Sequence, residues 1–553
     1  MDTKKIMVKW NTVGNRLPST SPQTESAIIA AVEIARAKRR AQFISITAVF
    51  TTYFTSFFSS SLMSNALPRI SAELNGMQSY SWAIAIPALA TAFATLIFGK
   101  VSDMFGRKSI LLTALSFMLV GATLCALSGT FSFLVVALCL LSLGAGSLMP
   151  LCFSVIGDMF PPAERGKWAG LLSITSGFTA FIGPTLAGWF VDNPGWRYIY
   201  WSNIPFILLA GILVLCGLPA RVQKHEHRID FMGSICVAMA SASLIIAFSW
   251  AGNKYPWFSF PVLSLMGGSI FLWILFFRIE SRAQEPMLDP QVLKNRTFLI
   301  AALAAVFSMF GITTMNFYFP LFLQGVRQTS ATLSGQILTP YSALNSFMGL
   351  PAGFILSKTR RYKWIYISGY AILVIGMFGA ILLSPQTPIP LILVLSAWVG
   401  FGLGSIPIIN AMVVQYAVPK RLLGSATGSF YFFLMMGRAI APAILGSIVN
   451  ATYRQDVLTR IPGGLTDSLD KNVLQSINNP RLLLSASSMS ELQKSILAQG
   501  EKGQYLFQQL TQGMRIALGT GLRNLFLISG IAMLVSFLVI LLVPEIDLES
   551  RDQ

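Results

Sequence analysis

Two stretches of equal length contain the pattern that best predicts the fold. Residues 144–188 read GAGSLMPLCFSVIGDMFPPAERGKWAGLLSITSGFTAFIGPTLAG, and residues 402–446 read GLGSIPIINAMVVQYAVPKRLLGSATGSFYFFLMMGRAIAPAILG. A shift of 258 residues places Gly or Pro on Gly or Pro at the pairs Gly144 and Gly402, Gly146 and Gly404, Pro161 and Pro419, Gly166 and Gly424, Gly170 and Gly428, Pro184 and Pro442, and Gly188 and Gly446. This register indicates an internal repeat.

The composition around this repeat is that of a membrane protein. Of the 553 residues, 54% are hydrophobic and 11% are charged, and the mean hydropathy is +0.65. Soluble domains carry about 25% charged residues, whereas charges inside a bilayer are costly and rare. The net charge is +18, but the Lys and Arg residues lie between apolar runs, where they orient a membrane protein. We therefore expect no nucleic-acid partner.

Apolar runs long enough to cross a bilayer, about 20 residues each, predict an all-α integral membrane protein with fourteen spans. The repeat pairs the fifth span with the thirteenth and the fourth with the twelfth. This predicts two six-helix halves, 43–218 and 298–543, and two extra central helices in 231–277, the arrangement of transporters that rock around a midplane site. The expected spans are 43–66, 81–101, 109–128, 131–156, 168–190, 200–218, 231–250, 260–277, 298–317, 332–356, 364–383, 389–412, 424–448 and 521–543.

Basic residues predict the orientation of these spans. The connections after even-numbered spans are rich in Lys and Arg, and the others are poor, so the rich side should be cytoplasmic. The basic tail 1–42 and the tail 544–553 are then cytoplasmic, and the long polar segment 450–518 is extracytoplasmic. Within that segment, Tyr505–Leu518 has the apolar spacing of a helix lying along the membrane surface or on the outer mouth. In the basic tail, Ser21 and Pro22 predict the start of a separate helix over 25–40.

The connection between the second and third spans contains Gly99-Lys-Val-Ser-Asp103-Met-Phe-Gly106-Arg107-Lys108. It resembles the cytoplasmic motif of the major facilitator superfamily. With the fourteen spans and the fifth-span glycines, the chain resembles the fourteen-span drug:proton antiporters of that superfamily. The resemblance implies a cell-membrane (inner-membrane) protein and a conformational latch made by Gly99, Asp103, Gly106, Arg107 and Lys108. The second half departs from the motif, because Ser357 stands where the first half has Asp103.

Proline and glycine in the repeated spans predict places where helices bend and pack closely. Pro184 and Pro442 each remove an intrahelical hydrogen bond, and small residues allow close helix approach. We expect a hinge or gating role for Gly177, Gly183, Pro184, Gly188, Pro442 and Gly446.

Acidic residues are missing where drug antiporters of this kind have them. Ser59 stands in place of the first-span Asp, before Ala66-Leu67-Pro68, and no Asp or Glu lies well inside any span. Arg438 is the one charge at membrane depth, and such a cation is usually functional. Candidate residues of a substrate cavity are Arg438, Asn345, Tyr341, Asn316, Asn410 and Ser59.

These features favour export of small amphipathic organic compounds or drugs by alternating access, with a small-molecule substrate, membrane lipids and, as an open question, protons as partners. One alternative is an anionic or neutral lipid-like molecule or metabolite, moved with weak coupling or none. A second is a transporter-like sensor without turnover. We expect no enzyme activity, because no nucleophile–base arrangement or metal set stands out, and no cofactor. His225 and His227 flank Glu226, but a metal site needs three or four converging ligands, so we expect a solvated loop and no metal site there. We expect a monomer.

Overall fold

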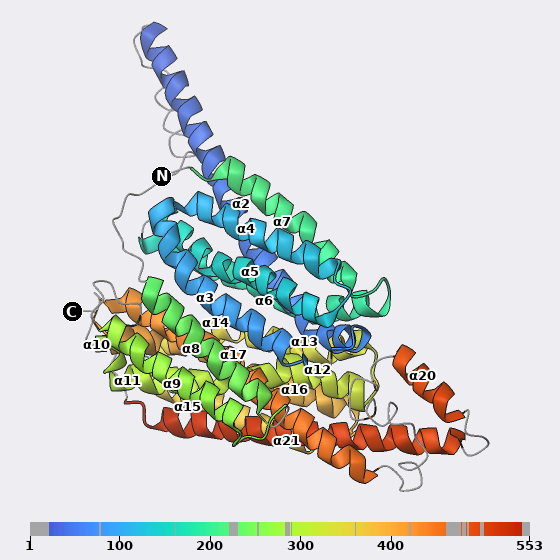
Figure 1. Ribbon diagram of the computed structural model, residues 1–553. Helices are drawn as coiled ribbons and strands as arrows, with labels where there is room; N and C mark the ends of the chain where they lie inside the picture. The colour runs from blue at the N-terminus through green and yellow to red at the C-terminus, as the bar shows by residue number, and fades with distance from the viewer. Residues whose placement is uncertain are drawn as a thin grey trace.

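The computed structural model describes residues 22–76, 79–160, 162–219, 231–251, 254–281, 288, 290–359, 361–419, 422–460, 477, 483, 486–497 and 503–544. Across these residues the protein is helical, apart from one isolated bridge between Ala251 and Tyr255. Figure 1 shows the long helices running side by side, with α2 and α21 extending past the rest of the bundle. The all-α fold expected from the apolar runs is confirmed.

The first half of the chain forms α2 (Pro22–Glu73), α3 (Trp82–Phe105), α4 (Arg107–Ala126), α5 (Phe131–Met159), α6 (Pro162–Asp192) and α7 (Arg197–Gly217). Two helices follow, α8 (Phe231–Trp250) and α9 (Phe260–Glu280). They pack on each other, and α8 also contacts α3 and α17.

The rest of the chain begins with α10 (Pro290–Leu293), α11 (Arg296–Thr313), the π-helix η2 (Thr314–Tyr318), α12 (Phe319–Leu321) and a second π-helix η3 (Phe322–Val326). It continues with α13 (Ala331–Phe347), α14 (Gly349–Thr359), α15 (Lys363–Ile381) and α16 (Ile389–Ala417). It ends with α17 (Leu423–Arg460), α20 (Ala486–Leu497) and α21 (Gly503–Leu541).

Helix packing repeats between the two parts of the chain. In the first, α2 packs on α6 and α7, α4 packs on α5 and α7, and α3 packs on α5. In the second, α11 packs on α17 and α21, α15 packs on α16 and α21, and α13 packs on α16. The helices correspond in chain order, so the sequence repeat is also a repeat of packing. The two bundles meet mainly through two further pairs, α6 with α13 and α3 with α17, and α2 adds smaller contacts with η2, α12 and α13.

Eleven helices in the described residues are long and apolar enough to cross a membrane. The apolar stretches Trp82–Thr95 and Ile235–Trp250 are shorter, and the span expected at 332–356 is divided between α13 and α14. The break follows from Pro351, which has no N–H to bond the carbonyl of Phe347.

Two expectations about helix ends are wrong. The helix expected over 25–40 is continuous with the first span, because 41–42 contain no Gly or Pro, and α2 runs through 52 residues. The helix predicted at Tyr505–Leu518 forms, but it does not end there, because it is the beginning of α21 and continues into the last span. Its apolar residues Leu510, Met514 and Leu518 are buried, and α21 packs along α17.

Candidate functional site

The two bundles approach each other most closely at glycines of α6, α13 and α17. A Cβ on Gly188 would overlap the carbonyl oxygen of Ala331, and one on Gly335 would overlap that of Pro184. On the other pair of helices, a Cβ on Gly446 would collide with the side chain of Ser81. Backbone carbonyls cannot move aside as a flexible side chain can, so these contacts exist because the residues are glycine.

These contacts gather at one end of the bundle, here called the Asp192 end because α6 finishes there. Asn65 of α2 is fully buried. Its Nδ2 donates to the carbonyl oxygens of Pro184 (3.0 Å) and Ala331 (2.8 Å). Ser334 donates to Asn65 Oδ1 (2.8 Å), and Gln324 Nε2 donates to the Asn65 carbonyl (3.0 Å). One amide thus joins helices of both bundles.

Asp192 adds a charged contact at the same end. Its carboxylate accepts hydrogen bonds from the backbone N–H groups of Ala331 (3.2 Å) and Thr332 (2.7 Å), and from the Thr332 hydroxyl (2.6 Å). These are the first N–H groups of α13, which have no partner inside their own helix. A carboxylate is stabilised there by the helix dipole. An acid at the end of α6 therefore holds a helix of the other bundle.

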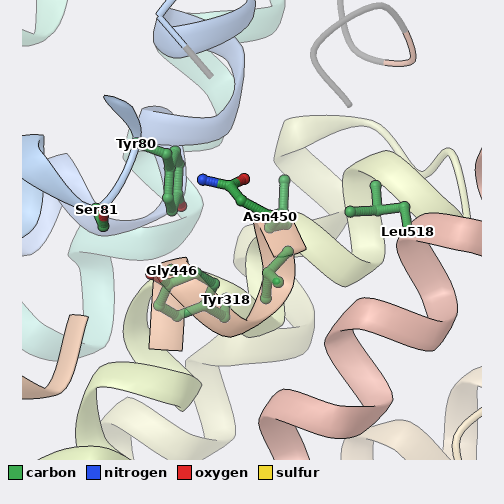
Figure 2. Close-up of a pocket in the computed structure, with 8 residues that line it drawn as sticks. Tyr80, Ser81, Tyr318, Gly446, Asn450 and Leu518 are labelled. Atoms are coloured by element: carbon green, nitrogen blue, oxygen red, sulfur yellow. The ribbon is translucent and has the colours of Figure 1, made fainter. Parts of the chain in front are cut away.

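Tyr80 and Tyr318 complete this closure beside α17. Tyr80 Oη donates to the carbonyl of Phe317 (2.7 Å), and Tyr318 Oη donates to that of Pro442 (3.1 Å). The two rings pack edge to face with centroids 5.6 Å apart. Figure 2 shows Tyr80 facing Asn450. The pocket that these two residues line has a volume of about 10 Å³, no larger than a water molecule. The Asp192 end is therefore tightly packed.

Below this closure lies a cavity of about 310 Å³ between the two bundles. On α3 its lining runs from Ala83 to Thr95, or about 18 Å along the helix axis. It continues toward the opposite end of the bundle, here called the Arg107 end, where α3 finishes. The first bundle supplies mainly hydroxyl groups and apolar side chains, and its polar members are Ser56, Ser59, Ser60, Ser61, Thr91, Thr95, Ser142 and Thr179.

The second bundle supplies the charge and the amides. Arg438, Asn345, Asn316, Tyr341, Ser342 and Tyr431 line the cavity from this side. Among the described lining residues, Arg438 is the one that carries a charge. It lies twelve residues into the apolar stretch Ala426–Val457 of α17 and is half-buried. Among the residues that the structure describes, its guanidinium has no acidic partner and forms no hydrogen bond.

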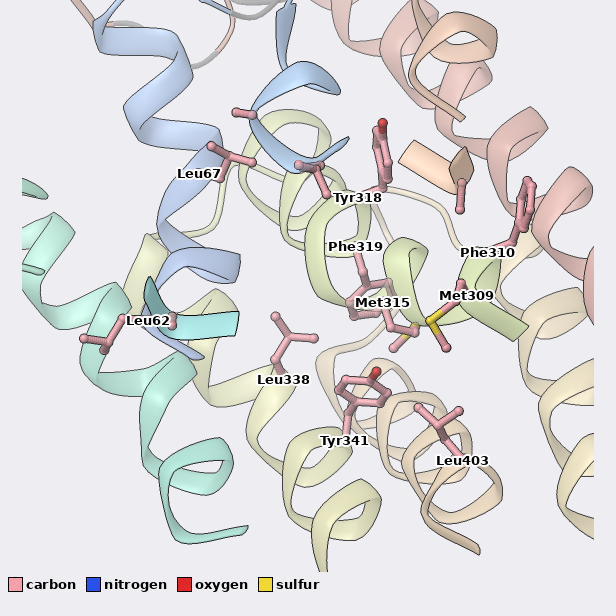
Figure 3. Close-up of a cluster of buried hydrophobic side chains, with 14 of the residues drawn as sticks. Leu62, Leu67, Met309, Phe310, Met315, Tyr318, Phe319, Leu338, Tyr341 and Leu403 are labelled. Carbon is pink, nitrogen blue, oxygen red and sulfur yellow. The ribbon is translucent and has the colours of Figure 1, made fainter. Parts of the chain in front are cut away.

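Tyr341 contributes a buried hydroxyl to the cavity lining. Its side chain is 1% exposed, and its hydroxyl has no hydrogen-bond partner among the described residues. Figure 3 shows its ring on α13 beside Met315 of η2. Asn316, the next residue, lines the cavity from this π-helix, and such short π segments occur frequently at functional sites.

Five of the six expected cavity residues thus line this cavity, and Asn410 does not. Asn410 is buried between α15 and α16, where its Oδ1 accepts a hydrogen bond from Tyr366. Among the expected hinge residues, a Cβ on Gly183 would overlap Ser61, and one on Gly177 would lie 3.3 Å from Phe347. Pro184 also lines the cavity, and Pro442 accepts from Tyr318.

The expected latch lies at the Arg107 end. Gly106 links α3 to α4 with φ +87°, a conformation that favours glycine. Arg107 pairs with Asp158 at the end of α5 (3.1 Å) and also bonds Ser102. Lys108 Nζ donates to the carbonyl of Leu215 in α7 (2.7 Å). Gly99 and Asp103 belong to α3, but the side chain of Asp103 is outside the described part of the structure.

Several residues of the site were not among those expected from the sequence. Asn65, Gln324 and Ser334 make the closure at the Asp192 end, and Thr91, Thr95 and Ser142 line the cavity. An Asn within an apolar run is the one signal that could have identified Asn65, because buried amides join helices in membranes. The hydroxyl residues give no such signal, since Ser and Thr commonly bond their own helix, as Thr91 does to Pro87.

This chain is similar to several transporters. It is 28% identical over 414 residues, 75% of this chain and 76% of the relative, to the multidrug transporter protein MdtP of Bacillus subtilis. It is 27% identical over 438 residues, 79% of this chain and 85% of the relative, to multidrug resistance protein 3 of the same organism.

Among solved structures, the fold resembles a bacterial homolog of the human lysosomal transporter Spinster in an inward-facing, unoccupied conformation. The TM-score is 0.57 at 15% identity, covering 91% of this chain and 98% of the other. The model of the major facilitator superfamily matches residues 49–442. The chain is therefore a multi-pass membrane transporter, not an enzyme, and belongs to the major facilitator superfamily.

Proposed function

We propose that this protein exports small amphipathic organic compounds by alternating access. The observation that carries the proposal is the 310 Å³ cavity between the two bundles, which mixes aromatic and methionine side chains with hydroxyls, amides and one cation. Ligand sites of proteins are mostly apolar with a few placed polar groups, and methionine adapts to ligands of different shape. The names of the two Bacillus relatives, both multidrug proteins, support the same class.

Alternating access would use the closure at the Asp192 end as one of two states. In the second state the Asn65 and Asp192 contacts open, and the helices at the Arg107 end come together. Small interface residues let helices slide or tilt against one another, and Pro184 and Pro442 lie beside the contacts that must separate. The segment Gly99–Lys108 would stabilise the state closed at its own end.

In the membrane, we expect all fourteen spans predicted from the sequence to cross the bilayer. The α8–α9 pair would then be inserted between two six-helix halves. Both termini would be cytoplasmic, segment 450–518 extracytoplasmic, and the protein a monomer in the cell membrane. In a variant without the five native cysteines, Ser490→Cys should react with an impermeant maleimide on intact cells, and Thr359→Cys should react only after permeabilisation. The reverse pattern would contradict this topology.

Proton coupling should be weak or absent. Antiport of protons requires a group in the cavity that titrates at accessible pH, for which a buried carboxyl is suited. No acid is found among the described lining residues, and guanidinium does not deprotonate in proteins. A sensor without turnover is less well supported, because it would not need a cavity that reaches so far along the bundle.

The proposal is tested with purified protein in proteoliposomes. Amphipathic fluorescent compounds should stabilise the protein against heat and cross the membrane with it, at similar rates with and without an imposed pH gradient. Stabilisation without flux would favour the sensor, and strong uphill flux driven by the gradient would overturn the weak coupling. Neither stabilisation nor flux with any compound would refute the proposed transport.

A further inference from the structure

Arg438 is a cation at membrane depth for which the described residues offer no balancing acid. It lies well inside an apolar stretch of α17 and lines the cavity. The described residues provide no ion pair for it, although Arg107, Arg197 and Arg460 each pair with an acid elsewhere in the structure. Desolvating an unpaired charge is expensive, and charged residues at such positions usually meet a ligand or a partner.

Tyr341 provides a second observation, from a different helix, because its hydroxyl also lacks a hydrogen-bond partner among the described residues. It comes from α13 rather than α17, its side chain is 1% exposed, and its hydroxyl is unpaired among the described residues. A buried hydroxyl without a hydrogen bond costs about 1–3 kcal/mol. The same cavity thus contains a guanidinium and a phenol that are both able to donate.

The polar groups around them point to the charge of the ligand. Guanidinium can only donate, and the Asn316 and Asn345 amides and the Tyr341 hydroxyl can all donate as well. A carboxylate, sulfonate or phosphate accepts several such bonds, and bonds between charged partners are about twice as strong as neutral ones. An ammonium group would meet Arg438 with no described acid in the lining to offset the repulsion.

The remaining wall favours an apolar body next to that anionic group. Met63, Met149, Met435, Phe57 and Phe317 all line the cavity. Its volume of about 310 Å³ is at the small end of the usual range for ligand sites. A compact molecule with an apolar body and one acidic group matches both parts of the wall.

We propose that the cavity selects amphipathic organic anions, with Arg438 as the residue that determines charge specificity and Tyr341 as a second donor. This inference rests on the proposed transport function. It assigns the cationic drugs to the disfavoured class, and it gives a role to the one charge among the described residues that line the cavity.

The test uses three dansyl compounds that differ mainly in charge: dansylglycine (anion), dansylglycinamide (neutral) and dansylethylenediamine (cation). Each is measured by thermal stabilisation of the full-length protein and by proteoliposome flux. The variants are Arg438→Gln, Arg438→Lys and Tyr341→Phe. Arg523→Gln is the matched control, because it removes a cation from an exposed position of α21 outside the cavity.

We expect wild type to move the anion in preference to the cation. Arg438→Gln should lower anion flux at least about tenfold, the effect of one lost charge-assisted contact, while neutral flux is retained. Arg438→Lys should restore part of the anion flux. Tyr341→Phe should weaken stabilisation by the anion roughly threefold without lowering the stability of the ligand-free protein, which a structural role of the hydroxyl would lower.

Three results would overturn the inference. If wild type and Arg438→Gln move all three compounds equally well, transport stands but charge selection by Arg438 does not. If both Arg438 variants lose the anion and the neutral compound alike and unfold at lower temperature than Arg523→Gln, the residue has a structural role only. Failure of wild type to bind or move any of the three would instead refute the transport function, and the inference with it.

Discussion

The interface between the two bundles has two regions that treat polar groups differently. At the Asp192 end, Asn65 and Asp192 form hydrogen bonds with groups of the opposite bundle at 2.6–3.2 Å. In the cavity, Arg438 and the Tyr341 hydroxyl have no partner among the described residues. Asn65 and Asp192 find their hydrogen-bond partners within the protein, whereas the Arg438 guanidinium and the Tyr341 hydroxyl face the cavity without one among the described residues. The difference separates residues that set the conformational state from residues that recognise a substrate.

The largest effect is expected from a bulky side chain in the contacts between the bundles at the Asp192 end. Gly188→Leu would place a side chain where the carbonyl of Ala331 lies. Overpacking of this kind costs about 3 kcal/mol or more, so the closed Asp192 end should be almost depopulated and flux should fall about 100-fold. Gly211→Leu is the control, since no atom lies within 4 Å of a Cβ at Gly211. Proteoliposome flux measures the effect, and equal flux in both variants would contradict it.

Asn65→Ala removes the central amide of the Asp192 end and leaves the cavity residues unchanged, so it tests the two regions separately. The carbonyls of Pro184 and Ala331 lose a donor, and Ser334 loses an acceptor. Buried groups left unsatisfied cost about 1–3 kcal/mol, so the temperature of unfolding should fall and the Asp192 end should open more often. Anion binding by the cavity should keep its charge preference. Asn193→Ala, one residue beyond Asp192 and exposed, should change neither; a comparable loss in that control would remove the special role of Asn65.

Asp192→Asn should have a smaller effect in the same direction. It removes the negative charge at the start of α13 but retains an oxygen that can accept from Thr332. Charge at a helix N-terminus contributes about 0.3–1 kcal/mol at an exposed site and is screened by salt. The opening should therefore be clearest at low ionic strength. Asp456→Asn, whose partner Arg460 is in its own helix, serves as the control, and a salt-independent effect would argue against the dipole explanation.

Asp158→Asn should change the Asp192 end least. The Arg107–Asp158 pair is partly exposed and lies within one bundle, and exposed pairs contribute about 0–1 kcal/mol. We expect the reactivity of a single cysteine at Tyr80 with a maleimide to stay within about twofold of the unmutated background. A larger change would mean that the two ends of the bundle are coupled through this pair.

The fold could be predicted well because hydropathy and a repeated Gly and Pro pattern report directly on spans and on helix contacts. Gly188 and Gly446, aligned by the repeat, both lie where the two bundles meet. Helix ends were predicted less well. Hydropathy marks where lipid surrounds a helix, not where the helix stops, so α2 and α21 extend far past their apolar segments.

The site, like the fold, could be predicted only in part from the sequence. Arg438 is visible in the sequence because a charge interrupts an apolar run. The closure is not, because it depends on pairs such as Asn65 and Ala331, which are 266 residues apart, and only the packing of the two bundles brings these together. Asn410 shows the limit of reading polarity alone, since its amide satisfies Tyr366 rather than facing the cavity.

The most direct test of alternating access around this cavity is a cross-link between Thr185 of α6 and Thr339 of α13. Their hydroxyl oxygens are 2.8 Å apart across the two bundles. In a variant without the five native cysteines, Thr185→Cys and Thr339→Cys together should cross-link on oxidation, hold the Asp192 end closed and stop flux. Reduction should restore flux, and dansylglycine should still stabilise the cross-linked protein, because the cavity remains intact. Full cross-linking with unchanged flux would contradict alternating access around this cavity.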